Sequence, residues 1–247
     1  MADFDFEHLK RDLLDGVSAA ANGMANMAGQ AAEAVQEAAK DTHERAVNYR
    51  DFRRFGYDLA TSGMVSSHGG NMSLTDGSRI WVTRTGSMLG HLGPKDILCV
   101  NWQPDAELDA NASMELKVHR AMYQAAAAGL AEGQPLGQMA IVHAHSLYTT
   151  LHSLFSNTIM PLDSEGVYLL GASVPVLTPQ QAVASDEVAA LMADVVRKGG
   201  KLGIVRGHGP FVLADSLENA YRLVSALEYS THMLTLVDQY GRSVPMR

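Results

Sequence analysis

The sequence lacks three features that mark common classes of protein. It has a single cysteine, Cys99, so it can form neither an intrachain disulfide nor a zinc site built from several thiolates. It has no run of about 18 apolar residues, the length that a membrane-spanning helix needs. Its 19 Lys and Arg are outnumbered by 27 Asp and Glu, which argues against nucleic acid as the main partner. Any metal ligands should therefore be nitrogen and oxygen atoms.

The N-terminus is acidic where a secretory signal would be basic, so we expect a cytoplasmic protein. With 247 residues and 47% apolar content, the chain is long enough to bury a substantial core. We divide it into an Ala-rich helical extension, residues 1–43, and a catalytic domain, residues 44–247.

The extension has an amphipathic pattern. Residues 6–40 lack proline, and Phe6, Leu9, Leu13 and Val17 recur at helical spacing. Residues 18–39 contain few large hydrophobic side chains, so they can bury little area alone. Two interpretations stay open: a surface or oligomer-contact helix, and a helix that docks on a partner or an encapsulating shell.

The catalytic domain begins with a helix and a hairpin. The pattern predicts a helix over residues 44–60, ending at Ser62-Gly63. A Gly-rich turn then leads into a strand, Asp76-Gly77 is a hairpin signal, and residues 79–83 are the returning strand. These elements predict an antiparallel meander.

Three histidines and one carboxylate form the strongest functional pattern. In an extended strand, His143 and His145 point to the same face, and His208 and Glu115 add two further donors. His-x-His alone is weak evidence, because a strand histidine is often only a satisfied polar side chain. The apolar residues 141–142 and 202–205, which precede the histidines, favour a metal site with a position open to water or substrate.

The Gly-rich turn is a second candidate site. Gly69 and Gly70 allow backbone N–H groups to approach an anion, and Asn71 adds an amide donor. A tight turn before a hairpin needs the same residues without any ligand. The turn leads into a strand, so it is neither a dinucleotide fingerprint nor a P-loop.

Together these motifs resemble the class II aldolase/adducin family over residues 46–237. The resemblance implies a three-layer α/β/α domain around a mainly antiparallel sheet, and a cyclic homotetramer with active sites at subunit interfaces. The landmarks occur in the family's order: Gly70-Asn71-Met72-Ser73, Thr83-Arg84-Thr85-Gly86, Ser113-Met114-Glu115, His143-Ala144-His145 and Gly207-His208-Gly209.

The resemblance also implies roles for individual residues. Metal ligands would be His143, His145 and His208, with zinc as the expected ion, although manganese, iron and cobalt also suit such donors. Glu115 would be the catalytic acid and base. The phosphate pocket of the substrate would be formed by Gly70, Asn71, Thr85, Gly86 and Ser113.

The expected function is a class II, zinc-dependent aldolase. It would cleave a ketose 1-phosphate to dihydroxyacetone phosphate and an aldehyde through a metal-bound enediolate. One alternative is a metal-dependent decarboxylase or epimerase of a related hydroxy-keto acid or sugar phosphate. Another is an adducin-like binding module without catalysis, which the retained histidines and Glu115 argue against.

Four positions depart from the family or extend its pattern. Met114 stands where sugar-phosphate aldolases usually have a second Ser, and His68 where they tend to have Thr. Glu165 falls near a family Tyr, and is either a solvated loop edge or a substrate contact. Tyr240 is a candidate for donation to a neighbouring subunit's site.

Two more residues keep open interpretations. His119 lies four residues after Glu115 on a predicted helix and is either support for the site or part of the core. Arg206 either pairs with an anion of the substrate or forms an ion pair at a strand end.

Overall fold

The computed structural model describes residue 30 and residues 49–240, and the structural statements below concern these residues. The predicted extension and its boundary at residues 43–44 lie outside them, apart from residue 30. No helix in the described ranges is long and apolar enough to cross a membrane.

Eight strands form one sheet in the order β3-β2-β1-β4-β8-β7-β6-β5. Neighbours are antiparallel except β6 and β7, which are parallel and are joined through helix α5. The strands are β1 (Asn71–Thr75), β2 (Arg79–Thr83), β3 (Ile97–Asn101), β4 (Met139–His143), β5 (Thr158–Ile159), β6 (Val174–Leu177), β7 (Leu202–Val205) and β8 (Gly209–Ala214).

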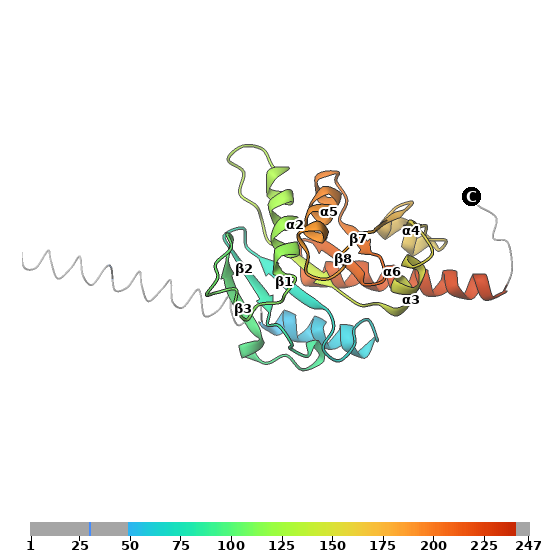
Figure 1. The fold of residues 1–247 in the computed structure, drawn as a ribbon, viewed down its shortest axis with the longest axis horizontal. Helices are drawn as coiled ribbons and strands as arrows, with labels where there is room; N and C mark the ends of the chain where they lie inside the picture. Colours follow the sequence, from blue (N-terminus) through green and yellow to red (C-terminus); the bar gives the residue numbers. More distant parts are fainter. Residues whose placement is uncertain (1–29, 31–48, 241–247) are drawn as a thin grey trace, which may run out of the picture. The chain divides into compact units, whose positions relative to one another are not determined.

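Helices cover both faces of this sheet (Figure 1). A helix over residues 49–61 ends before Gly63, whose φ of +74° suits a glycine-terminated helix. The other helices are α2 (Leu116–Ala128), α3 (Leu147–Ser153), α4 (Ser164–Leu170), α5 (Asp186–Arg197) and α6 (Leu217–Tyr240), with short 3₁₀ turns η1 (Leu89–His91) and η2 (Pro94–Asp96).

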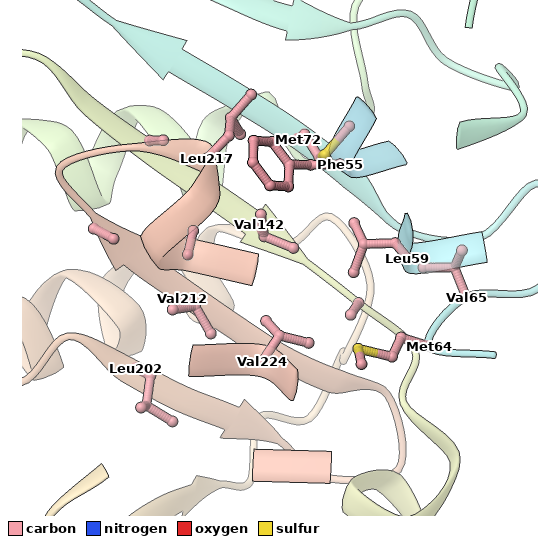
Figure 2. Close-up of a cluster of buried hydrophobic side chains, with 14 of the residues drawn as sticks. Phe55, Leu59, Met64, Val65, Met72, Val142, Leu202, Val212, Leu217 and Val224 are labelled. Carbon is pink, nitrogen blue, oxygen red and sulfur yellow. The ribbon is translucent and has the colours of Figure 1, made fainter. Parts of the chain in front are cut away.

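The alternation of side chains along each strand divides the core in two. On one face, the helix of residues 49–61 and α6 pack on strand residues such as Met72 and Val142, as Figure 2 shows. On the other face, α2 and α5 pack on Ile141 and Phe211. Adjacent residues 141 and 142 thus face opposite layers, as strand geometry requires.

The structure confirms the three-layer α/β/α fold with a mainly antiparallel sheet, and the predicted hairpin. It adds a β6–α5–β7 crossover that the sequence patterns did not predict. The carboxyl ends of β6 and β7 matter for the site, because the loops that follow two parallel strands leave the sheet at the same edge. Cys99 lies in β3, partly buried against the core, as a small apolar side chain.

Candidate metal centre

Three histidines meet where β4 and the β7–β8 turn lie side by side. His143 is the last residue of β4, whereas His145 lies two residues beyond the strand and His208 sits in the turn before β8. The backbone beyond β4 stays anchored, because His145 N–H donates to Met64 O at 3.0 Å. One possible ligand atom of each histidine lies within 4.8 Å of the others.

The ring nitrogens are already divided into two roles. Nδ1 of His143 faces the Pro210 carbonyl at 2.9 Å, and Nδ1 of His208 faces the Ala182 carbonyl at 2.8 Å. A carbonyl only accepts, so each Nδ1 carries the proton and each Nε2 carries a lone pair. Those Nε2 atoms lie 3.3 Å apart. Two lone pairs cannot hydrogen-bond to each other, but a shared cation would satisfy both.

Burial keeps the imidazoles of His143 and His145 neutral. It is the first cause that lowers the pKa of His143 well below its ordinary value, and the neighbouring His208 and His145 lower it further. Burial and His208 also lower the pKa of His145. Neutral imidazole is the form that binds a metal ion.

Glu115 closes the cluster from the start of α2. It is 4% exposed, and its Oε2 lies 3.1 Å from Nε2 of His143 and accepts from Nδ2 of Asn71 at 2.9 Å. Oε1 is buried with no hydrogen-bond partner in the described structure. Since an unpaired buried carboxylate oxygen is costly, this atom also fits a nearby cation.

The sheet explains why Asn71 reaches Glu115. In the β1–β4 ladder, Asn71 is the direct partner of His143, so its side chain starts beside the clustered histidines. Its Oδ1 is also buried without a partner in the described structure. Asn71, a predicted anion-binding residue, therefore contacts Glu115, the predicted acid and base.

The Gly-rich turn passes against the ligands. A Cβ at Gly70, which has a φ of +74°, would come within 2.7 Å of the His143 carbonyl. A Cβ at Gly69 would meet Nδ1 of His145 at the same distance. Both glycines are therefore needed for close approach, whether or not the turn binds an anion.

A cavity of about 120 Å³ opens onto this centre. It brings together all the predicted site residues except His143, Glu165 and Tyr240, and adds Arg84, Ser87 and Val183. Its lining is His68, Gly69, Gly70, Asn71, Arg84, Thr85, Gly86, Ser87, Ser113, Met114, Glu115, His145, Val183 and His208.

A larger hollow of about 840 Å³ lies beside the helix of residues 49–61. Arginine and tyrosine side chains dominate its described lining, and none of the three clustered histidines lines it. The volume of a hollow therefore does not identify the candidate site in this structure. The converging donor atoms of the three histidines identify it.

Comparisons with known proteins identify the family of the chain. Residues 50–235 match the family described as Class II Aldolase and Adducin N-terminal domain. The chain belongs to this family. A methylthioribulose-1-phosphate dehydratase of Bradyrhizobium is 31% identical in an alignment of 199 positions that covers 73% of this chain and 87% of that protein.

Two further members show how the family varies. A 3-oxo-tetronate 4-phosphate decarboxylase of Escherichia coli is 28% identical in an alignment of 196 positions that covers 76% of this chain and 85% of that protein. The crystal structure of L-fuculose-1-phosphate aldolase from Thermus thermophilus is 31% identical, with a TM-score of 0.69, and the match covers 81% of this chain and 98% of that one. Family members thus carry names of three different reactions.

Glu165 and Tyr240 lie elsewhere in this chain. Glu165 is exposed in the first turn of α4, and Tyr240 is 75% exposed at the end of α6. Neither lines the cavity at the histidines. A catalytic role for either would need a second copy of the chain to bring it to the site.

Two residues whose roles the sequence left open have structural partners. Arg206 donates to the Ser153 carbonyl, to Asn157 Oδ1 and to Thr178 Oγ1, so its guanidinium braces the turn that carries His208. A substrate anion would have to compete with these protein groups.

His119 is fully buried, with Nδ1 2.6 Å from Ser73 Oγ. Burial is the main cause that lowers its pKa to about 3, although Glu115 opposes the shift. The histidine is therefore a neutral member of the buried layer behind the site.

Proposed function

We propose that this chain is a metal-dependent aldolase that cleaves a ketose 1-phosphate to dihydroxyacetone phosphate and an aldehyde. The observation that carries the proposal is the convergence of three imidazole Nε2 atoms and the buried Glu115 carboxylate at the floor of a polar cavity. Neutral histidines leave the full charge of a bound cation available to the substrate, as carbonyl chemistry requires.

The ion would be held by His143, His145 and His208, and zinc is the first expectation for these ligands. Manganese, iron and cobalt also suit nitrogen and oxygen donors. When bound, the ion supplies Lewis-acid stabilisation of negative charge on a carbonyl oxygen. The Pro210 and Ala182 carbonyls orient the rings of His143 and His208 through Nδ1, which would leave Nε2 of each ring to hold the ion.

Glu115 is proposed to transfer a proton to or from the substrate in the aldolase reaction. Its carboxylate is held at the floor of the cavity by Asn71, which donates to Oε2. In the cleavage direction the carboxylate would accept, directly or through water, the proton of the hydroxyl that becomes the aldehyde carbonyl and would give it to the substrate carbon that loses its bond. Condensation would reverse both transfers. The backbone N–H of Glu115 donates to Ser113 Oγ at 3.3 Å. This hydrogen bond joins Glu115, the proposed acid and base, to the predicted phosphate site.

The substrate phosphate is proposed to bind at Thr85, Gly86 and Ser113, with Gly70 and Asn71 beside it. Gly86 has a φ of +68°, and nothing lies within 4 Å of the position of a Cβ there, so its backbone is open to a ligand. Met114 supplies no hydroxyl, so the site has one hydrogen bond fewer than a two-serine pocket, worth about 1.5–3 kcal/mol toward a charged acceptor.

The decarboxylase and epimerase alternatives use the same centre. An arginine such as Arg206 can hold the carboxylate of a substrate acid. Its guanidinium instead donates to three protein groups, which favours the aldolase. An adducin-like binding module would have no use for converging Nε2 atoms and a buried carboxylate.

We also propose that the protein works as a homotetramer. Large apolar side chains are exposed on α3, on α4, on α6 and in the segment between α3 and α4, more than a monomer usually shows in one region. They are Leu147, Leu151, Leu154, Phe155, Met160, Leu162, Val167, Tyr168, Tyr229, Leu236 and Tyr240. A neighbouring copy would cover them and could carry Glu165 or Tyr240 to the site.

A metal and product assay tests the proposal. Purified protein should contain about one divalent ion per chain, and His143→Ala should lose it. Release of dihydroxyacetone phosphate from a panel of ketose 1-phosphates would support the aldolase. Release of CO₂ from carboxylated analogues, with no cleavage of the ketose 1-phosphates, would reject it in favour of decarboxylation. Glu115→Gln should keep the ion but lose about 10²–10⁴-fold in turnover.

A further inference from the structure

The hollow of about 840 Å³ beside the helix of residues 49–61 is rich in positive charge. Arg50, Arg53 and Arg54 line it from this helix, which is blue in Figure 1, and His91 lines it from η1. We call it the basic hollow after these four residues. Asp58 is the only acidic residue in its described lining, whereas the whole chain has a formal net charge of −8. The sign of the charge in the hollow is therefore opposite to that of the protein.

The three arginines of the basic hollow have no anionic partner among the described residues. No carboxylate pairs with them there, and none of their guanidinium groups donates a hydrogen bond. Arg54 lies over the ring of Phe55, 5.1 Å from its centroid. Arg50 is three residues before Arg53 and four before Arg54, so the helix places like charges side by side, which destabilises it. An anion bound between these side chains would remove this repulsion.

The two walls of the basic hollow are fixed against each other. The Tyr49 hydroxyl donates to the Leu92 carbonyl at 3.2 Å, which ties the start of the helix to the residue after η1. At Gly56 the helix passes so close to η1 that a Cβ would collide with the Leu89 carbonyl. Leu89 and Leu92 are themselves buried in the core. A ligand would therefore find the walls already in place and would not have to order them.

The size and charge of the basic hollow indicate a phosphorylated small molecule. Its volume lies within the range of about 300–1,000 Å³ that is usual for small-molecule sites. Guanidinium groups suit phosphate because they form paired hydrogen bonds with its oxygen atoms. Arg50 and Arg54 lie about 6 Å apart along the helix axis, which favours two or more linked phosphate groups over a single one. A nucleic acid is disfavoured, because the acidic protein would repel a long polyanion.

We propose that the basic hollow binds a small molecule that carries two or more linked phosphate groups. This site is separate from the candidate metal centre, because no residue lines both the hollow and the cavity at the histidines. It is also independent of the reaction proposed above. Asp58 would repel the anion, so the phosphate groups belong nearer Arg50 and Arg53. Tyr57, which is 55% exposed in the same lining, offers a ring face to the base of a nucleotide.

Calorimetric titration of the full-length protein with pyrophosphate provides the test. Pyrophosphate should bind about tenfold more tightly than inorganic phosphate, because its second phosphate group reaches a further guanidinium. Arg50→Gln and Arg53→Gln should each weaken the binding of pyrophosphate about tenfold, the factor for one hydrogen bond to a charged group. Asp58→Asn should strengthen it about two- to fivefold, since it removes the opposing charge at an exposed site.

Two control variants locate the bound anion. Arg222→Gln removes one exposed positive charge from α6, outside the basic hollow, and should leave the affinity for pyrophosphate unchanged. Ser113→Ala alters the predicted phosphate site at the metal centre and should also leave it unchanged. ADP distinguishes the two sources of linked phosphates. Tighter binding of ADP than of pyrophosphate, lost in Tyr57→Leu, identifies a nucleotide, and equal affinities identify the phosphate groups alone.

Four results would overturn the proposed site. The first is the absence of pyrophosphate binding up to millimolar concentrations. The second is an affinity that Arg50→Gln and Arg53→Gln leave unchanged while Ser113→Ala lowers it, which would assign the anion to the metal centre. The third is an equal loss in Arg222→Gln, which would reduce the effect to general electrostatic attraction. The fourth is a change of oligomeric state of the arginine variants in light scattering, which would show that these side chains pair with a neighbouring copy.

Discussion

The buried histidine behind the site should make stability depend on pH. His119 lies in the layer between β1 and α2, is 0% exposed and is bonded through Nδ1 to Ser73 Oγ. Its Nε2 has no partner in the described structure. The proposed perturbation is His119→Asn, because an Asn amide reaches about as far as Nδ1 and can keep the bond to Ser73 without titrating between pH 5 and 7.

The magnitude follows from the pKa of His119 in the two states. In the folded protein, burial lowers it to about 3, and in the unfolded chain we take the ordinary value of about 6.5. Between these two values the unfolded chain binds a proton that the folded protein excludes. The free energy of unfolding therefore decreases as the pH falls from about 6.5 toward 3 and is insensitive to this group above that window. From pH 7 to pH 5 the loss is about 2 kcal/mol.

The assay is urea unfolding of metal-free protein at pH 7, 6 and 5, with chelator present for every variant. His119→Asn should be less stable than the wild type at pH 7, because it removes buried ring atoms. Its further loss on acidification to pH 5 should be smaller than the wild-type loss by about 2 kcal/mol. His91→Asn, which removes an exposed histidine in η1, is the control.

Equal acid sensitivity of the wild type and His119→Asn would refute the reasoning. It would mean that protonated His119 is accommodated in the fold, through water reaching Nε2 or a rearrangement toward Glu115. His143 and His145 are present in both proteins, so their own titration cancels in the comparison.

Three further substitutions test how the site is supported. Asp109→Asn should cost about 3–5 kcal/mol in urea unfolding, because it breaks the bidentate, largely buried pair with Arg120. Since hydrogen bonds from Arg120 hold the pKa of Asp109 below its ordinary value, the wild type should lose this stability as the pH falls below about 4. Glu228→Gln should weaken metal binding about tenfold in a competition titration, because Glu228 accepts from the backbone N–H groups of Tyr148 and Thr149 in the first turn of α3, just beyond His145. Arg206→Lys should weaken it by a similar factor, since a lysine cannot reach all three acceptors, while the unfolding slope with urea stays unchanged.

The three-histidine cluster could be predicted because its signal is local and chemical. A histidine at the end of an apolar run, and another two residues later, need only strand geometry to be brought together. His208 is 63 residues beyond His145 in the sequence, and ordered motifs rather than periodicity linked it to the pair. The structure places all three in one cluster.

The supporting groups could not be predicted in the same way. Ala182 and Pro210 act through backbone carbonyls, and every residue has a carbonyl, so neither side chain signals the role. The partners of Arg206 come from α3, the segment after it and the end of β6, which only tertiary structure brings together. Val183 had no signal as a cavity residue, because an isolated valine is ordinary in any segment.

The two sides of the site are supported in different ways. His143 is fixed by the ladders of β4 with β1 and β8, so moving it would disturb the centre of the sheet. His208 and Val183 depend instead on a turn and on a loop at the sheet's carboxyl edge. A loop can change its sequence at small cost to the core, whereas a central strand cannot. We therefore expect the loop side of the site to vary most among related proteins, which are named as an aldolase, a dehydratase and a decarboxylase.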